Sequence, residues 1–110
     1  LGGNPERVSA ELVERYHDLL LRSGNRTALH RFLRVLSVPD DTLRETVNRI
    51  TTPTLIQWGL QDPLYSVNQA ERLRTKLPDS SLVTYLSAGH LPMEEIPEQT
   101  ARDASSHLNR

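Results

Sequence analysis

Residues 53–90 read PTLIQWGLQDPLYSVNQAERLRTKLPDSSLVTYLSAGH, and this stretch decides the fold. Two runs within it, TLIQWG at 54–59 and SLVTYLS at 81–87, are rich in aliphatic, β-branched and aromatic residues and predict strands. Between them, alanine and leucine recur at helical spacing over about 67–77, and Ser66 is a plausible N-cap. Because strand, helix and strand in this order form a parallel crossover unit, we expect two parallel strands.

Helices are predicted on both sides of this unit. Upstream, Ser9 caps the first of two amphipathic helices, and Gly24 separates them. A short third helical segment over 43–50 ends ahead of Pro53. Downstream, Pro97 begins a last helix. Two strands make an incomplete parallel sheet, so further strands are expected upstream. The expected apolar face of the last helix consists of Ala101, Ala104 and Leu108.

The composition describes one small unit or a piece of a larger one. The chain has 110 residues, a net charge of -1 and no cysteine, so it is not a disulfide scaffold. No apolar run approaches the roughly 18 residues that suggest a membrane-spanning helix. Neither end has a block of basic residues. We therefore expect neither nucleic acid nor, for this segment, a membrane as partner.

The chain begins with Leu1, not methionine, in the loop-like segment LGGNPERVS, which leads us to expect that it starts inside a longer protein. A signal peptide or an anchor would then lie upstream, so the sequence does not assign a compartment. The absence of cysteine favours the cytoplasm only slightly.

The residues directly after the two strands are the candidate functional residues, because ligands of open parallel sheets bind outside the carboxyl ends of the strands. GLQDP after the first strand supplies Asp62, and SAGH after the second supplies His90, 28 positions later. A carboxylate beside an imidazole is the orienting half of a nucleophilic triad. The acid fixes the tautomer, and the other ring nitrogen takes a proton from the nucleophile. We expect the two side chains to lie within hydrogen-bonding distance.

These residue types also have structural interpretations. An Asp before Pro is most often a turn or cap residue, and a single loop histidine is more often solvated than catalytic. Glu94 and Glu95 suit the start of the last helix, where the helix dipole favours acids. The helical histidines His17, His30 and His107 have charged neighbours, and no pair of them has metal-ligand spacing with an acid. No metal site is therefore expected.

Residues 53–99, which extend the opening stretch through LPMEEIPEQ, resemble the C-terminal part of the α/β-hydrolase fold family. In that family the last two core strands are followed by an Asp or Glu loop and then by a Gly-His loop. The upstream half resembles, more loosely, the end of the helical lid of many members. The matching features are Pro53, the first strand, Trp58-Gly59, Asp62-Pro63, LPDSSL before the second strand, Gly89-His90 and Glu95-x-Pro97-Glu98.

The resemblance implies the fold class α/β and, within it, the C-terminal portion of an α/β-hydrolase fold: the last two parallel strands with flanking helices, plus lid-derived helices. Residues 1–26 would be the end of the lid, and residues 27–110 the C-terminal part of the core. Asp62 and His90 would be the acid and the general base of an esterase-like acyl hydrolase that acts on a small-molecule substrate without a cofactor. Weaker candidates for substrate contacts are Tyr65, Leu91 and Met93.

The nucleophile has no counterpart in the chain. The family places it in a G-x-S-x-G elbow after an earlier strand, and no such motif occurs here. Ser66, the serine nearest to Asp62, is explained as a helix cap. The chain holds two-thirds of a triad, so we expect it to be catalytically inactive by itself.

Two alternatives stay open. An upstream elbow with an Asp nucleophile would make the protein a member of the haloalkane dehalogenase or epoxide hydrolase type. Alternatively, the chain is a non-catalytic interaction module in which the His-Asp pair is merely inherited. In each case the open edge of the sheet favours self-association.

Overall fold

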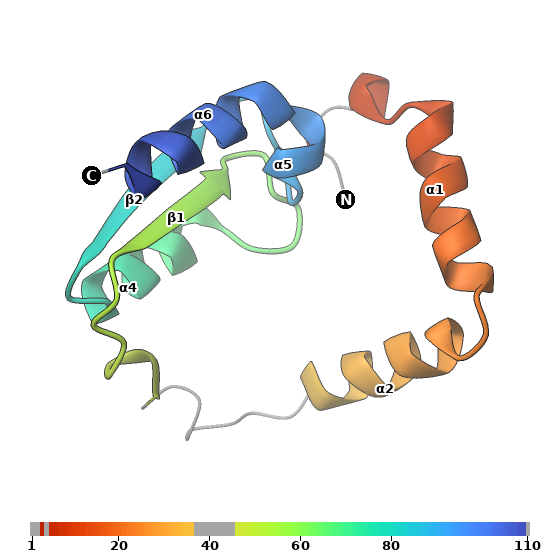
Figure 1. Ribbon diagram of the computed structural model, residues 1–110, viewed down its shortest axis with the longest axis horizontal. Helices are drawn as coiled ribbons and strands as arrows, with labels where there is room; N and C mark the ends of the chain where they lie inside the picture. The colour runs from red at the N-terminus through yellow and green to blue at the C-terminus, as the bar shows by residue number, and fades with distance from the viewer. Residues whose placement is uncertain (1–2, 4, 37–45, 110) are drawn as a thin grey trace.

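The computed structural model describes residues 3, 5–36 and 46–109, which form an α/β half and a helical arm (Figure 1). The predicted order of strands and helices is confirmed in the described residues. Two short elements were not predicted: α5, and a 3-10 helix within the segment expected to be a loop. The α/β half contains β1 (Thr54–Gly59), α4 (Val67–Lys76), β2 (Ser80–Tyr85), α5 (Pro92–Glu95) and α6 (Pro97–Leu108). The arm contains a 3-10 helix (Pro5–Arg7), α1 (Ala10–Leu21) and α2 (Asn25–Leu36).

The third predicted helical segment, 43–50, lies partly outside the described residues. Thr46 and Val47 are helical, and the next two residues form a turn. The N–H groups of Arg49 and Ile50 donate to the carbonyl oxygens of Thr46 (3.0 Å) and Val47 (3.2 Å). The described part therefore consists of two helical residues and a turn, after which the chain becomes extended and enters β1.

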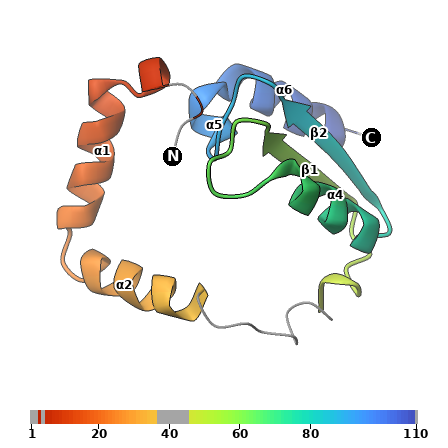
Figure 2. The same cartoon turned by 180° about the vertical axis from the view of Figure 1, so that it is seen from behind.

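β1 and β2 form a parallel sheet in direct register, from Thr54 opposite Ser80 to Gly59 opposite Tyr85. α4 makes the crossover and lies on one face of the sheet, and α6 lies on the other face (Figures 1 and 2). β2 ends at Tyr85, so the expected continuation through the next two residues is wrong. The reason is a turn, in which the Ala88 N–H donates to the Tyr85 carbonyl at 3.4 Å.

The apolar core lies between the sheet and α4. Ile56 from β1 is buried against Ala70 and Leu77, which confirms the predicted inward face of the crossover helix. Ala70 is fully inaccessible, so a larger side chain there would force the helix away from the sheet. Partly buried side chains complete the cluster: Val47, Trp58, Leu73 and Leu82.

The face of the sheet towards α6 is held by polar contacts. Gln57 Nε2 donates to the Tyr85 hydroxyl (2.8 Å) and to the Thr100 carbonyl (2.9 Å). The Tyr85 hydroxyl in turn donates to Asp103 Oδ2 at 2.8 Å. Burial and the Asp103 carboxylate raise the pKa of Tyr85 to about 12, so the phenol stays a neutral donor at physiological pH. One chain of hydrogen bonds thus joins both strands to α6.

The expected apolar face of α6 is wrong. Leu108 is 81% exposed, Ala101 is exposed and Ala104 is half-buried, whereas Thr100 is buried and Asp103 half-buried. The reason is that the sheet presents polar partners to this helix. A helix that can form hydrogen bonds to them turns its polar side inward, because buried polar groups are costly when unpaired.

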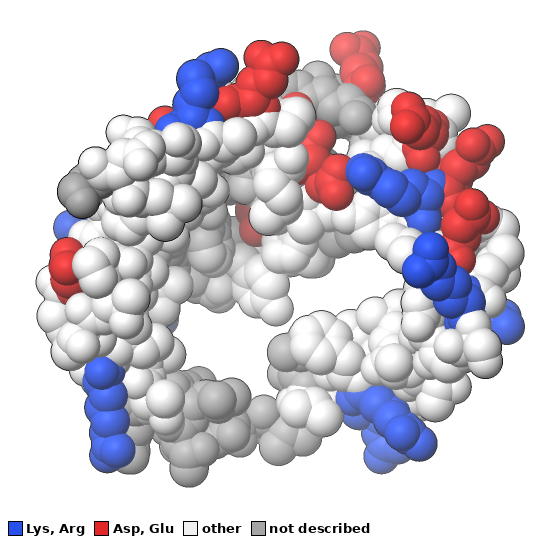
Figure 3. Space-filling model, in the orientation of Figure 1, with Lys and Arg blue, Asp and Glu red and all other residues white. Residues whose placement is uncertain are grey.

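The arm begins and turns where the sequence predicts. Ser9 caps α1, since its Oγ accepts the Leu12 N–H at 3.1 Å, and Gly24, with φ of 82°, lies between α1 and α2. Figure 3 shows an opening between the arm and the α/β half. Among the described helices, none has the length and apolarity to cross a bilayer. Large apolar side chains of the arm are exposed: Val13, Tyr16, Leu20, Leu21, Leu29, Phe32, Leu33 and Val35.

In the described part of the chain, β1 pairs only with β2. The Thr54 N–H donates to the carbonyl of Asp79, just before β2, and the Leu60 N–H donates to that of Tyr85, so alternate residues such as Leu55 direct their N–H groups to the open side. We propose that the isolated 110-residue chain self-associates through this edge.

Sedimentation velocity over a range of concentrations should therefore give a mass above that of the monomer. Leu55→Pro removes one outward N–H and should reduce association, whereas the control Leu55→Ile keeps that N–H and should not. A wild-type chain that stays monomeric at every concentration and unfolds cooperatively would contradict the proposal.

Candidate active site

The carboxyl ends of β1 and β2 bring the two predicted residues together. Because the strands are parallel and in register, the loops after Gly59 and Tyr85 leave the same edge of the sheet. Asp62 Oδ2 lies 2.8 Å from His90 Nδ1. The predicted contact between Asp62 and His90 is therefore confirmed, and their catalytic role stays a prediction.

The Asp62 carboxylate is fixed on both of its oxygens. Oδ2 contacts His90, and Oδ1 accepts the N–H groups of Leu64 (2.8 Å) and Tyr65 (3.0 Å). The side chain of Asp62 is 6% exposed, against 29% for that of His90. The turn that an Asp-Pro pair predicts is thus present, and it orients the acid towards the imidazole.

Electrostatics favours the ionised acid. Burial by itself would raise the pKa of Asp62, but the hydrogen bond with His90 and the two backbone N–H groups outweigh it, and the pKa is lowered from its ordinary value of 3.8. An ionised carboxylate only accepts hydrogen bonds, so His90 Nδ1 is the donor in this contact. The neutral ring then has Nε2 as its acceptor, which is the tautomer that a general base requires.

The three weaker candidates lie around His90 in different ways. The rings of Tyr65 and His90 are 5.7 Å apart at an angle of 36°, and the Tyr65 carbonyl accepts the Trp58 indole N–H at 3.3 Å. Tyr65 is 45% exposed. Leu91 is half-buried beside His90, and Met93 on α5 is 57% exposed. Tyr65 is the one that the structure brings into contact with the imidazole.

The peptide before His90 lies directly against Gly59, a close approach that the sequence did not reveal. A Cβ on Gly59 would collide with the carbonyl oxygens of Ala88 and Gly89 and would lie 2.6 Å from the Ala88 carbonyl carbon. The Gln61 N–H also donates to the Ala88 carbonyl at 2.9 Å. The loop of the acid and the loop of the histidine are therefore joined through their backbones.

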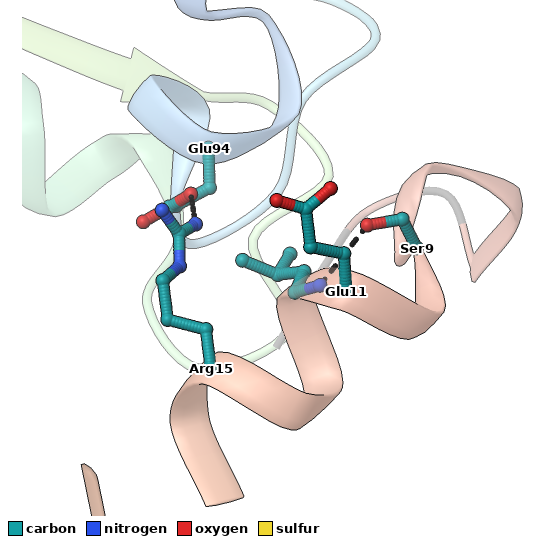
Figure 4. Close-up of a pocket in the computed structure, with 5 residues that line it drawn as sticks. Ser9, Glu11, Arg15 and Glu94 are labelled. Atoms are coloured by element: carbon teal, nitrogen blue, oxygen red, sulfur yellow. Dashed lines mark hydrogen bonds and ion pairs between the residues drawn. The ribbon is translucent and has the colours of Figure 1, made fainter. Parts of the chain in front are cut away.

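A second contact ties the arm to α5 (Figure 4). Arg15 Nη2 pairs with Glu94 Oε2 at 2.7 Å, and the Tyr16 hydroxyl donates to Glu94 Oε1 at 3.3 Å. The sequence explains Glu94 by its helix position alone, because nothing marks a partner 79 residues away. Figure 3 shows acidic side chains around α5 and the start of α1, with basic side chains of α1 beside them. A cavity of about 180 Å³ is lined by Ser9, Glu11, Leu12, Arg15 and Glu94.

Neither Asp62 nor His90 lines this cavity, so it is separate from the candidate active site. Among the described residues, no three His, Cys, Asp or Glu side chains gather as they would around a metal ion. The chemistry that the arrangement offers is proton transfer at His90 Nε2, with Asp62 holding the ring.

The chain is similar in sequence to known proteins. The chain is 28% identical over 85 residues to the AB hydrolase superfamily protein YisY of Bacillus subtilis, a match that covers 77% of this chain and 31% of that protein. It is 33% identical over 61 residues to monoacylglycerol lipase ABHD6 of Mus musculus, covering 56% of this chain and 18% of the lipase. No family model matches the chain.

A solved structure shows the same fold. The crystal structure of a serine hydrolase involved in carbazole degradation matches with a TM-score of 0.79 and 22% identity, over 92% of this chain and 40% of that chain. The chain thus spans 31% of the length of YisY, 18% of the length of ABHD6 and 40% of the solved hydrolase.

Because backbone atoms lie so close to Gly59, we expect this position to be sensitive to any added side chain. Gly59→Ala should displace the peptide before His90, because the new methyl group meets backbone and not a flexible side chain. We expect a loss of about 1–3 kcal/mol in the free energy of unfolding and a changed NMR signal of the His90 ring. Gly24→Ala is the control, since a Cβ there has open space and costs only backbone strain in the arm. An unchanged His90 signal in Gly59→Ala would contradict this account.

The lowered pKa of Asp62 predicts a pH dependence of stability. Because this pKa is lower in the folded chain than in the unfolded chain, the ionised carboxyl stabilises the fold above its ordinary value of 3.8, and this contribution is lost as pH falls from there through the lowered value. Wild-type stability should therefore fall more steeply below about pH 4 than that of Asp62→Asn. Urea denaturation at several pH values measures both slopes, and equal slopes would refute the assignment.

Proposed function

Because this chain belongs to the α/β-hydrolase fold family, we propose that it supplies the acid and the general base of a catalytic triad to a hydrolase of ester or related acyl bonds. The observation that carries the proposal is the 2.8 Å contact between Asp62 Oδ2 and His90 Nδ1 at the carboxyl edge of the sheet. The nucleophile would come from an upstream G-x-S-x-G elbow, a motif that does not occur in these 110 residues.

In the proposed mechanism, His90 Nε2 takes the proton of the nucleophile as the nucleophile attacks the acyl carbon, and later donates that proton to the leaving group. The ring becomes cationic in between. Asp62 stabilises that cation because its carboxylate is ionised, little exposed and already hydrogen-bonded to Nδ1. The two backbone N–H groups on Asp62 Oδ1 prevent the acid from rotating away.

An acyl substrate with an apolar chain suits the surroundings of His90. Tyr65 lies against the imidazole, and the apolar side chains of Leu91 and Met93 follow His90 in the chain. The similarity to a protein named monoacylglycerol lipase supports an ester as the bond that is cleaved. In this proposal, residues 1–26 are the end of a lid over the site, and residues 27–110 belong to the core.

The test uses the full-length protein that carries this chain, with p-nitrophenyl acyl esters as substrates. His90→Ala should lower kcat by about 10²–10⁴-fold or more, because the general base is lost. Asp62→Asn should also lower kcat, through the wrong tautomer of the ring. His30→Ala is the matched control, since His30 is exposed on α2.

The isolated 110-residue chain should show no ester turnover above that of its own His90→Ala variant, because it has no elbow nucleophile to deprotonate. Turnover by the isolated chain that depends on His90 would contradict the division of roles. Full activity of the His90→Ala variant in the full-length protein would remove the triad assignment altogether.

A further inference from the structure

We propose that Glu95 is a positioning residue for His90, and this inference rests on the proposed function of that histidine. Glu95 is the last residue of α5 and is half-buried. Its Oε1 accepts the Gly89 N–H at 2.9 Å, and its Oε2 accepts the Gly3 N–H at 2.9 Å. One carboxylate thus binds the residue directly before His90 and a residue 92 positions away in the chain.

These contacts complete the support of the peptide between Ala88 and Gly89. The carbonyl of this peptide accepts the Gln61 N–H, its N–H donates to Glu95, and Gly59 lies against it. Hydrogen bonds from N–H groups to a carboxylate are charge-assisted and are about twice as strong as neutral ones. The backbone that sets the direction of the His90 side chain is therefore held from three sides.

Gly3 is tightly packed against the loops that carry Asp62 and His90. A Cβ on Gly3 would lie 2.7 Å from Gln61 Cβ and 2.8 Å from Gly89 N. Gly3 therefore fits between the loop of Asp62 and the loop of His90 only because it has no side chain. Glu95 binds two of these segments, through Gly3 and Gly89, and the Gln61 N–H links the third to the carbonyl of Ala88.

A misplaced base affects the reaction more than it affects binding. The His90 ring must keep Nδ1 on Asp62 and present Nε2 to the nucleophile, and a displacement of about 1 Å can cost roughly 10²-fold in rate. The hydrogen bonds of Glu95 go to the Gly89 and Gly3 N–H groups, so its contribution to His90 passes through the Gly89 peptide. The expected signature of its loss is a lower kcat with an unchanged KM.

The experiment compares Glu95→Gln with Glu98→Gln in the full-length protein. The amide of Glu95→Gln is neutral and has one acceptor oxygen in place of two. Both backbone N–H groups therefore lose a charged partner, and one of them faces an NH₂ group in place of an acceptor. Glu98 is the matched control because its side chain is 91% exposed on the first turn of α6. We expect Glu95→Gln to lower kcat by roughly 10- to 100-fold without changing KM, and Glu98→Gln to leave both unchanged.

A second readout does not depend on turnover. The Nδ1 proton of His90, held between the ring and Asp62, should give a shifted or broadened NMR signal in Glu95→Gln and an unchanged signal in Glu98→Gln. Glu95→Asp keeps the charge and disturbs the fold least, so it replaces Glu95→Gln as the test variant if Glu95→Gln does not fold. It should shift kcat and the ring signal in the same direction by a smaller amount.

The inference is overturned if Glu95→Gln matches Glu98→Gln in kcat and in the His90 ring signal. It is also overturned if kcat falls only in proportion to the fraction of folded protein while the ring signal of the folded form is unchanged. A wild-type protein without ester turnover would remove the proposed function. The ring signal would still decide the role of Glu95, because it reports the position of His90 with no substrate present.

Discussion

The parallel register of β1 and β2 is the constraint on which the candidate site depends. Gly59 lies opposite Tyr85, so both strands end at the same level and their loops meet. A shift of one residue would turn every side chain of the shifted strand to the opposite face of the sheet and would separate Asp62 from His90. Burying a carboxylate is costly unless its oxygens are paired, and here the two loops supply all three partners of Asp62. The register therefore makes the low exposure of the acid possible.

Backbone contacts, and not side chains alone, hold the two loops together. Gly59 and Gly3 occupy positions at which a Cβ would collide with neighbouring loops, and the Gln61 N–H bonds the Ala88 carbonyl. Small residues at such points allow the chains to approach until their peptide groups pair. A site built in this way has little freedom to adjust, so the orientation of His90 is set before any substrate arrives.

Periodicity and topology can be recognised in the sequence, whereas contacts between distant residues cannot. Runs of aliphatic, β-branched and aromatic residues predict both strands, and apolar spacing predicts the buried face of α4. Parallel topology then predicts the contact between Asp62 and His90. The inward face of α6 was missed because Gln57 and Tyr85 make a polar side favourable there. The contacts of Glu94 and Glu95 with the arm and the N-terminal segment have no local signal, since their partners lie 79 and 92 residues away.

The contact between the arm and the α/β half is too weak to fix the position of the arm by itself. Arg15 and Glu94 form an ion pair in which the arginine side chain is 58% exposed, and exposed pairs contribute about 0–1 kcal/mol. Fully burying one large apolar side chain contributes about 1.5–3 kcal/mol, and Phe32, Leu33 and Val35 on α2 are each more than half exposed. Covering these faces would outweigh the ion pair. The position of the arm relative to the α/β half therefore depends on what packs against α2 more than on the contact with α5.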